Sequence, residues 1–178
     1  MTLRLLNPRD ALAYRALMLE AYALHLDAFT SAPEERAALP LSWWEERLGE
    51  DAQAAERVFG VFQDGQLAGV AGLSFEQREK VRHKASLFGM YVPARHRQRG
   101  LGRQLVHAVL AGARDRPGVR LVQLTVTQGN ASAQALYESC GFTAFGVEPF
   151  AVAVDDGFVS KVHMWCNMGV FDAGPGQP

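Results

Sequence analysis

Apolar and polar residues alternate along several stretches of the chain, the pattern expected of strands with one buried face. The stretches that we predict as strands cover residues 2–6, 57–63, 66–75, 85–92, 119–127, 142–147 and 159–167. Asp64-Gly65 separates the second and third of these and is typical of a tight hairpin turn. Pro93 ends the fourth, because proline has no N–H to donate to a neighbouring strand. These runs predict a mainly antiparallel sheet.

Other segments place their apolar residues three or four positions apart, which predicts helices. The predicted helical segments are residues 10–26, 34–39, a piece beginning at 42, 100–114 and 131–139. Asp10 and Asn130 stand at the starts of two of them, where a short polar side chain can cap the first free N–H groups. Gly141 is placed to end the last helix.

The order of these elements predicts the fold class. A strand, a helix and a second strand follow one another from residue 85 to 127, which implies one parallel strand pair joined by a right-handed crossover. We therefore predict an α/β protein of the α+β type. Its mixed, mostly antiparallel sheet would have six or seven strands and about four flanking helices. Residues 1–170 are predicted to form one domain, and the Gly- and Pro-rich residues 171–178 a flexible tail.

Composition narrows the classes of partner. A formal net charge of −1 argues against a nucleic-acid-binding surface. No apolar run approaches the length of a membrane span, and Cys140 and Cys166 do not have the spacing of a metal site or of a secreted disulfide framework. We expect a cytoplasmic protein with reduced thiols, no metal and no contact with nucleic acid or membrane.

The segment from Met90 to Arg103 carries the strongest chemical signal. It places four arginines within nine residues, and a helix is predicted to open at Gly100-Leu101-Gly102. The first N–H groups of a helix have no partner within it and lie at the positive end of the helix dipole, so this helix start can bind a phosphate. A solvated basic helix end is the alternative, but positive charges at a helix N-terminus are unfavourable without an anion.

Two common phosphate-binding motifs do not fit this segment. A Walker loop requires Gly-Lys-Ser/Thr, and no lysine lies between Lys84 and Lys161. The third glycine of a dinucleotide-binding fingerprint would fall at Leu105, and the expected ribose-binding acid is missing. Nucleotide hydrolysis and dinucleotide binding are therefore disfavoured.

The residues instead resemble two signature segments of the GNAT N-acetyltransferase superfamily. Val92, Pro93 and Arg97-x-x-Gly100-x-Gly102 resemble the V-x-P-x-x-R-x-x-G-x-G segment, except that Pro93 directly follows Val92. The second likeness is Asn130-x-x-Ala133-x-x-Leu136-Tyr137-x-x-x-Gly141-Phe142, about thirty residues later. Two motifs in the correct order are far more specific than either alone.

The resemblance implies acetyl-CoA as co-substrate and assigns roles to particular residues. Main-chain groups near Met90 and Val92 would contact the pantetheine arm, residues 97–103 the pyrophosphate, and Asn130 the cofactor chain. The implied cofactor-binding set is Met90, Tyr91, Val92, Arg97, Gln98, Arg99, Gly100, Leu101, Gly102, Arg103 and Asn130. Tyr137 would be the catalytic residue beside the thioester sulfur.

Chemistry supports the role of Tyr137 independently. A departing thiolate needs a proton, and a phenol with a reference pKa of about 10 remains protonated at neutral pH. The alternative is a tyrosine that only packs the helix against the sheet, and Asn130 could likewise be a simple cap. No general base stands out: the candidates by residue type are Glu34, Glu35, Glu76, His25, His83 and His163, and water could also serve.

The leading hypothesis is an N-acetyltransferase that moves the acetyl group of acetyl-CoA to a primary amine of a small molecule or peptide. A non-catalytic acyl-CoA-binding protein and a GNAT-like enzyme with another acyl donor are the alternatives. The pairs Glu34-Glu35 and Asp155-Asp156 could attract a cationic amine. Sheet edges and the apolar segment 145–154 suggest a possible homodimer.

Overall fold

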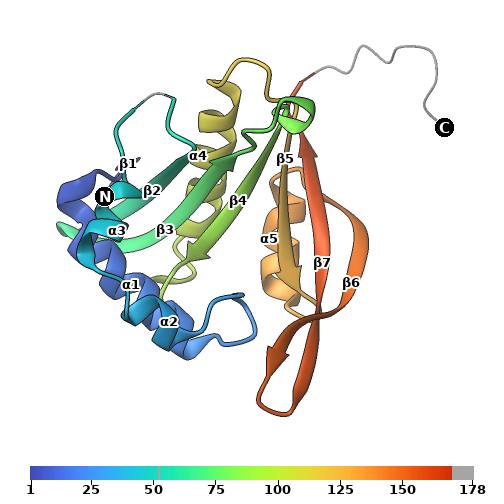
Figure 1. Cartoon of the computed structure of the whole chain (residues 1–178), viewed down its shortest axis with the longest axis horizontal. Helices are drawn as coiled ribbons and strands as arrows, with labels where there is room; N and C mark the ends of the chain where they lie inside the picture. Colours follow the sequence, from blue (N-terminus) through green and yellow to red (C-terminus); the bar gives the residue numbers. More distant parts are fainter. Residues whose placement is uncertain (52, 170–178) are drawn as a thin grey trace.

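A single sheet of seven strands lies at the centre of the protein in the computed structural model, which describes residues 1–51 and 53–169 (Figure 1). The strands are β1 (Thr2–Leu5), β2 (Glu56–Gln63), β3 (Gln66–Phe75), β4 (Lys84–Tyr91), β5 (Leu121–Thr127), β6 (Thr143–Val154) and β7 (Gly157–Asn167). The α-helices are α1 (Ala11–Leu24), α2 (Pro33–Ala37), α3 (Leu41–Glu46), α4 (Leu101–Arg114) and α5 (Ala131–Ser139). The predicted fold class is confirmed.

Strand pairing follows the order β1-β2-β3-β4-β5-β7-β6. The β4–β5 pair is parallel and every other pair is antiparallel, as expected when α4 provides the crossover between β4 and β5. The predicted hairpin between β2 and β3 is confirmed. Its turn residues Asp64 and Gly65 have φ angles of 50° and 78°, the positive values that this tight turn requires.

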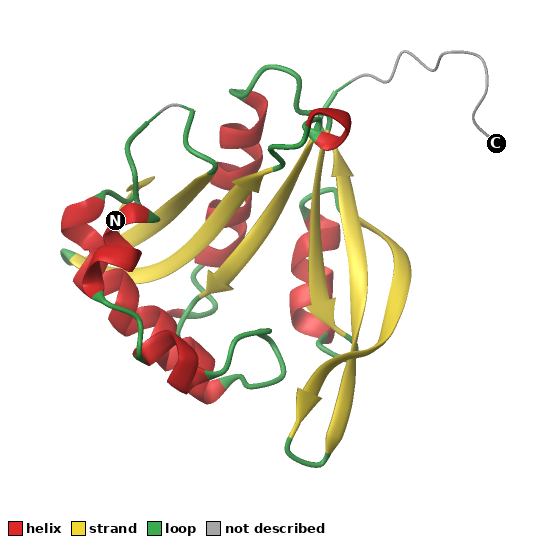
Figure 2. Cartoon of the chain, in the orientation of Figure 1, coloured by secondary structure: helices red, strands yellow, loops and turns green. Residues whose placement is uncertain are grey.

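Helices cover both faces of the sheet, each with its own apolar core (Figure 2). On one face, α4 packs Leu105, Val106 and Val109 on the sheet, where the helix lies over β2, β3 and β4, and these three side chains are fully buried. On the other face, α1 and α3 pack Met18 and Trp44 against the N-terminal strands. The helical periodicity of α4 thus arises from one continuous contact with the sheet.

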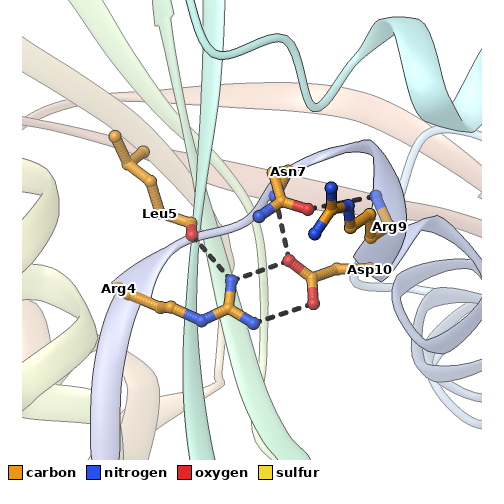
Figure 3. Close-up of polar contacts among 5 residues, drawn as sticks. All are labelled: Arg4, Leu5, Asn7, Arg9 and Asp10. Atoms are coloured by element: carbon orange, nitrogen blue, oxygen red, sulfur yellow. Dashed lines mark hydrogen bonds and ion pairs between the residues drawn. The ribbon is translucent and has the colours of Figure 1, made fainter.

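The predicted cap at Asp10 is wrong. Asp10 makes no capping bond to α1; its carboxylate instead accepts hydrogen bonds from Arg4 Nη1 at 2.7 Å, Arg4 Nη2 at 2.9 Å and the Asn7 main-chain N–H at 2.9 Å (Figure 3). Asn7 caps a short 3-10 turn (Pro8–Asp10) that precedes α1, its side-chain oxygen accepting from the Arg9 N–H. The Asp10 carboxylate faces the Arg4 guanidinium because this bidentate, charge-assisted pair is stronger than a single capping hydrogen bond.

The last hairpin is longer than predicted. β6 continues to Val154 instead of ending near 147, and β7 begins at Gly157. Four apolar side chains on this hairpin are more than half exposed: Phe145, Val147, Phe150 and Phe158. β6 is also an edge strand of the sheet, so the homodimer stays a prediction.

Two further expectations concern the ends and the surroundings of the chain. The predicted tail, residues 171–178, lies outside the described residues. Among the described helices, none has the length and apolar character needed to cross a membrane. The cytoplasmic location stays a prediction.

Candidate active site

The sheet separates between β4 and β5. Their parallel pairing joins only residues 84–86 to residues 121–123, and the two strands then diverge toward their C-terminal ends (Figure 1). A bulge in β4 accompanies the separation: the register with β3 shifts between Val70 and Gly72, and Gly89 has a φ of 55°. A bulge bends its strand and re-aims nearby groups, so the facing edges of β4 and β5 leave room for a ligand chain.

A cavity of about 650 Å³ runs along this separation to the start of α4. It collects nearly all of the residues that the sequence singled out. Those lining it are Met90, Tyr91, Val92, Arg97, Gln98, Gly100, Leu101, Gly102, Arg103, Asn130 and Tyr137. Arg99 does not line it; its Nη1 donates to Gln63 Oε1 at 3.2 Å, on the side of the β2–β3 hairpin.

The mouth of the cavity is the N-terminus of α4. Gly100 is the N-cap residue with a φ of 74°, and the first helical bond runs from the Gln104 N–H to the Gly100 carbonyl. The three N–H groups between them have no partner within the helix, which suits an anion. At Gly102 a Cβ would lie 3.0 Å from Leu136 Cδ2 and 3.3 Å from Met90 Cε, so this glycine permits close packing at the cavity wall.

The arginines around this mouth have different partners. Arg97 Nε donates to the Val92 carbonyl at 2.9 Å, and Arg103 Nη2 donates to Ser139 Oγ at 3.1 Å. Both side chains line the cavity, where each has further donors to offer an anion. Arg95 instead forms an ion pair with Glu20 on α1, with 2.8 Å between Nη1 and Oε1.

Glu20 is a supporting residue that the sequence did not reveal. Its Oε1 accepts hydrogen bonds from Arg95 Nη1 and, at 3.0 Å, from the Tyr91 hydroxyl. The bond from Arg95, and then the bond from Tyr91, lower the pKa of Glu20 against the opposing effect of burial. The carboxylate thereby ties the loop after β4 to α1. More than seventy residues separate these partners along the chain, so no local motif could indicate the contact.

Tyr137 projects from α5 into the cavity and is 8% exposed. Its hydroxyl donates to Met90 Sδ at 3.5 Å, and its ring lies edge-on to Phe142. Thioether sulfur is a weak acceptor, so a ligand sulfur could take over this bond. Burial, with a smaller contribution from Cys140, raises the pKa of Tyr137 to about 12, so the phenol keeps its proton over the whole physiological range.

Asn130 begins α5 and faces the same cavity. Its side-chain oxygen accepts a hydrogen bond from the Ala133 N–H at 3.2 Å, which confirms the predicted cap. The cap holds the side chain at the cavity wall and uses only its oxygen, so the amide N–H groups can donate to a ligand. Capping and ligand contact are therefore compatible roles for this residue.

A second cavity, of about 250 Å³, adjoins the first between the diverging strands. Met90, Asn130 and Tyr137 line both, and the second also reaches Thr127 and Lys161. Neither Thr127 nor Lys161 was anticipated from the sequence, although Lys161 is 4% exposed and Thr127 6%. A lysine within an alternating strand gives no signal of burial, because lysines usually occupy the solvent face.

The candidate bases do not converge on this second cavity, whose lining contains no Asp, Glu or His among the described residues. His25 lines the larger cavity, and His163 Nε2 lies 2.8 Å from Glu148 Oε2 on the β6–β7 hairpin. Glu34 and Glu35 line a separate groove of about 570 Å³ together with Asp155. The other two candidates, Glu76 and His83, are found in or next to the loop between β3 and β4.

Comparisons with known proteins agree with this arrangement. Residues 18–142 match the model of the acetyltransferase (GNAT) family. The [ribosomal protein bS18]-alanine N-acetyltransferase of Escherichia coli strain K12 is 32% identical over 108 residues, covering 61% of this chain and 69% of that protein.

Solved structures extend the likeness to nearly the whole chain. A GNAT-family acetyltransferase from Streptococcus pneumoniae superposes with a TM-score of 0.84 and 26% identity, over 94% of this chain and 99% of that one. The protein yncA from Salmonella typhimurium, solved with its cofactor acetyl-CoA, has a TM-score of 0.78 at 21% identity over 99% of both chains. At 21% identity, the likeness to yncA shows a shared fold.

The match to the GNAT family model shows that the protein is an acyltransferase. The chain belongs to the GNAT acetyltransferase family and is an N-acetyltransferase that uses acetyl-CoA.

Proposed function

We propose that acetyl-CoA lies along the larger cavity, with its pyrophosphate at the start of α4 and its thioester beside Tyr137. The observation that carries this placement is the convergence of the two sequence segments, 90–103 and 130–137, on one cavity. Arg97 and Arg103 would supply charge-assisted hydrogen bonds to the phosphates in addition to the helix N–H groups. Main-chain groups of Met90 and Val92, and the side chain of Asn130, would contact the pantetheine arm.

The reaction needs only residues of this cavity and water. The acceptor amine attacks the thioester carbonyl carbon, a C–N bond forms, and the C–S bond then breaks to release the CoA thiolate. We assign to Tyr137 the proton that this thiolate takes up. A phenol with a pKa of about 12 is a weak acid, but the same burial also raises the pKa of the departing thiol, which favours the transfer.

We assign the proton lost by the amine to water. The second cavity, where the acetyl group would lie and which we call the acetyl end, has no carboxylate or imidazole among its described lining residues to accept the proton directly. The neighbouring groove offers carboxylates at Glu34, Glu35 and Asp155, which would attract the cationic form of an amine before it loses its proton. Attraction and deprotonation are thus separate tasks in this proposal.

We propose that the acceptor is the amine of a peptide or protein. The relative from Escherichia coli is named for the alanine of a ribosomal protein. In this chain, the groove beside the acetyl end runs between residues 26–35 and residues 151–155, and its polar and apolar lining suits an extended segment. Residues 1–170 would act as one acetyltransferase domain, and a second copy could pair along β6.

A panel of amines tests the acceptor assignment. Release of free CoA thiol would be followed with acetyl-CoA and four acceptors: a short peptide with a free N-terminal alanine, the same peptide with a blocked N-terminus, a blocked peptide containing lysine, and a small polyamine. The assignment predicts the fastest release with the free N-terminal peptide or the lysine peptide. Release with the polyamine alone would contradict a peptide acceptor while leaving the transferase activity in place.

A further inference from the structure

Lys161 makes three hydrogen bonds from a nearly buried position on β7. Its Nζ donates to the Asp27 carbonyl at 2.9 Å, to the Ala28 carbonyl at 2.9 Å and to Thr127 Oγ1 at 2.8 Å. The Thr127 hydroxyl in turn donates to the Asp27 carbonyl at 2.8 Å. Two side chains from adjacent strands therefore bind the loop that follows α1: both bind the Asp27 carbonyl, and Lys161 also binds that of Ala28.

The arrangement of acceptors around Lys161 suits an ammonium. Thr127 spends its single O–H on Asp27, so toward Lys161 it can only accept. Three acceptors around Nζ require three N–H donors, which an ammonium has and a neutral amine has not. Burial lowers the pKa of Lys161, and the charges of Asp27 and Glu148 oppose that shift. The three hydrogen-bond acceptors around Nζ stabilise the charged form.

These bonds join two parts of the molecule that the sheet does not hold together at this point. Thr127, the last residue of β5, pairs with Lys161 within β7 on one side of the separation, and β4 has already diverged from β5 at this point. The loop comes from α1, which packs on the N-terminal strands, and extends toward the diverging ends of β4 and β5 (Figure 1). Leu26, Asp27 and Ala28 are exposed, so burial does not fix this part of the loop.

The loop after α1 lines both cavities and the neighbouring groove. Ala28 and Phe29 line both the larger cavity and its acetyl end, and Phe29 and Thr30 also line the groove toward the hairpin. A shift of this main chain would therefore change the passage between the acetyl group and the groove. The start of α4, more distant along the cavity, does not contact the loop through these bonds.

We propose that Lys161 is a positioning residue whose ammonium fixes the main chain of Asp27 and Ala28 across the separation of the sheet, and thereby shapes the entrance for the acceptor. The inference rests on the proposed function for the use of that entrance. The contact itself does not depend on it, so the two are tested separately. A shell of two carbonyls and one hydroxyl selects an ammonium, and a methionine of similar length cannot replace it.

The first test is limited proteolysis of the ligand-free protein with chymotrypsin, which cleaves after Leu26 and Phe29 when their segment opens. We expect Lys161→Met to accelerate cleavage at these two sites at least about fivefold, because the main chain of Asp27 and Ala28 loses its hydrogen bonds to the ammonium. Lys161→Arg should preserve most of the protection, since it keeps the charge and several donors. Lys84→Met, at the paired end of β4, is the matched control and should behave like the parent.

The second test separates binding of the two substrates. In Lys161→Met the KM for the acceptor should rise at least about fivefold, whereas the Kd for CoA should change less than about twofold because the phosphate-binding mouth is intact. Thr127→Val removes one of the three acceptors at nearly constant volume. It should raise the cleavage rate and the KM for the acceptor by smaller factors than Lys161→Met does. It replaces Lys161→Met if that variant does not fold.

Parental cleavage rates in the folded Lys161→Met protein, or in Thr127→Val as its substitute, would overturn the proposal. Faster cleavage with an unchanged acceptor KM would also overturn it, because the loop would then not shape the entrance. Failure to transfer acetyl groups to any amine would contradict the proposed function while leaving the cleavage result to be judged alone.

Discussion

The two ends of the cofactor cavity are built in different ways. At the phosphate end, the groups that can bind an anion come from one continuous segment, residues 97–103, and from the helix that it opens. At the acetyl end, Ala28, Thr127, Tyr137 and Lys161 come from four separate parts of the chain. The first end depends on local backbone geometry, and the second on how the halves of the sheet diverge.

This contrast has a physical origin. Free N–H groups at a helix start and a glycine with positive φ are properties of a few consecutive residues, so a short motif specifies them. A cavity between diverging strands requires every element on both faces to be in place. Changes at the phosphate end should therefore act on cofactor affinity, and changes at the acetyl end on turnover and acceptor use.

The largest effect is expected from Gly102→Glu. The new side chain would start 3.0 Å from Leu136 and would bring a negative charge to the helix start, so acetyl-CoA binding should be lost. At a ligand concentration of 100 times Kd, the parent gains about 2.7 kcal/mol of stability, and the variant should gain almost none. Thermal melts with and without acetyl-CoA measure this difference. Ala111→Glu places the same charge on an exposed position of α4 and should keep the full shift.

Tyr137→Phe should come next in size and should act on turnover alone. Phenylalanine keeps the ring and its packing against Phe142 but removes the hydroxyl, so kcat should fall by about a hundredfold, the typical contribution of a positioned acid. The Kd for acetyl-CoA should stay near the parental value. Tyr14→Phe, a fully buried tyrosine beneath α3, is the control and should retain parental kcat. A folded Tyr137→Phe protein with parental kcat would make Tyr137 a packing residue.

A smaller effect should distinguish two neighbouring arginines. Arg103 lines the cavity and Arg99 does not, although both lie within the same motif. Arg103→Gln should weaken acetyl-CoA binding about tenfold, corresponding to 1.4 kcal/mol for one lost charge-assisted contact. Arg99→Gln should change the Kd less than about twofold. Isothermal titration with both variants decides the matter, and equal losses would mean that Arg99 turns toward the cofactor on binding.

The smallest effect concerns the carboxylate that supports the loop after β4. Hydrogen bonds from Arg95 and Tyr91 lower the pKa of Glu20, so its contribution to stability is present above the unfolded pKa of about 4.3. That contribution is lost as the pH falls through the lower folded value. Glu20→Gln should therefore melt slightly below the parent at pH 6, and the two melting curves should converge toward pH 3. A gap of constant size from pH 6 to 3 would contradict the role of the charge.

The sequence by itself determined the order of the elements, the β2–β3 turn at Asp64-Gly65, the helix start at Gly100 and the cap at Asn130. Each of these depends on interactions within a few residues, which a linear pattern records directly. The same reasoning failed at Asp10, where a guanidinium from the preceding strand competed for the carboxylate.

Only the tertiary structure decided which side chains share a site. It separated Arg99 from Arg103, brought Glu20 to Arg95, and buried Lys161 against the main chain of Asp27 and Ala28. More than 130 residues separate Lys161 from that loop, and a lysine in a strand usually faces solvent, so its neighbours in the sequence do not indicate this contact. Its ammonium is covered by the loop after α1, whose carbonyls reach it only once the helix and the sheet have packed together.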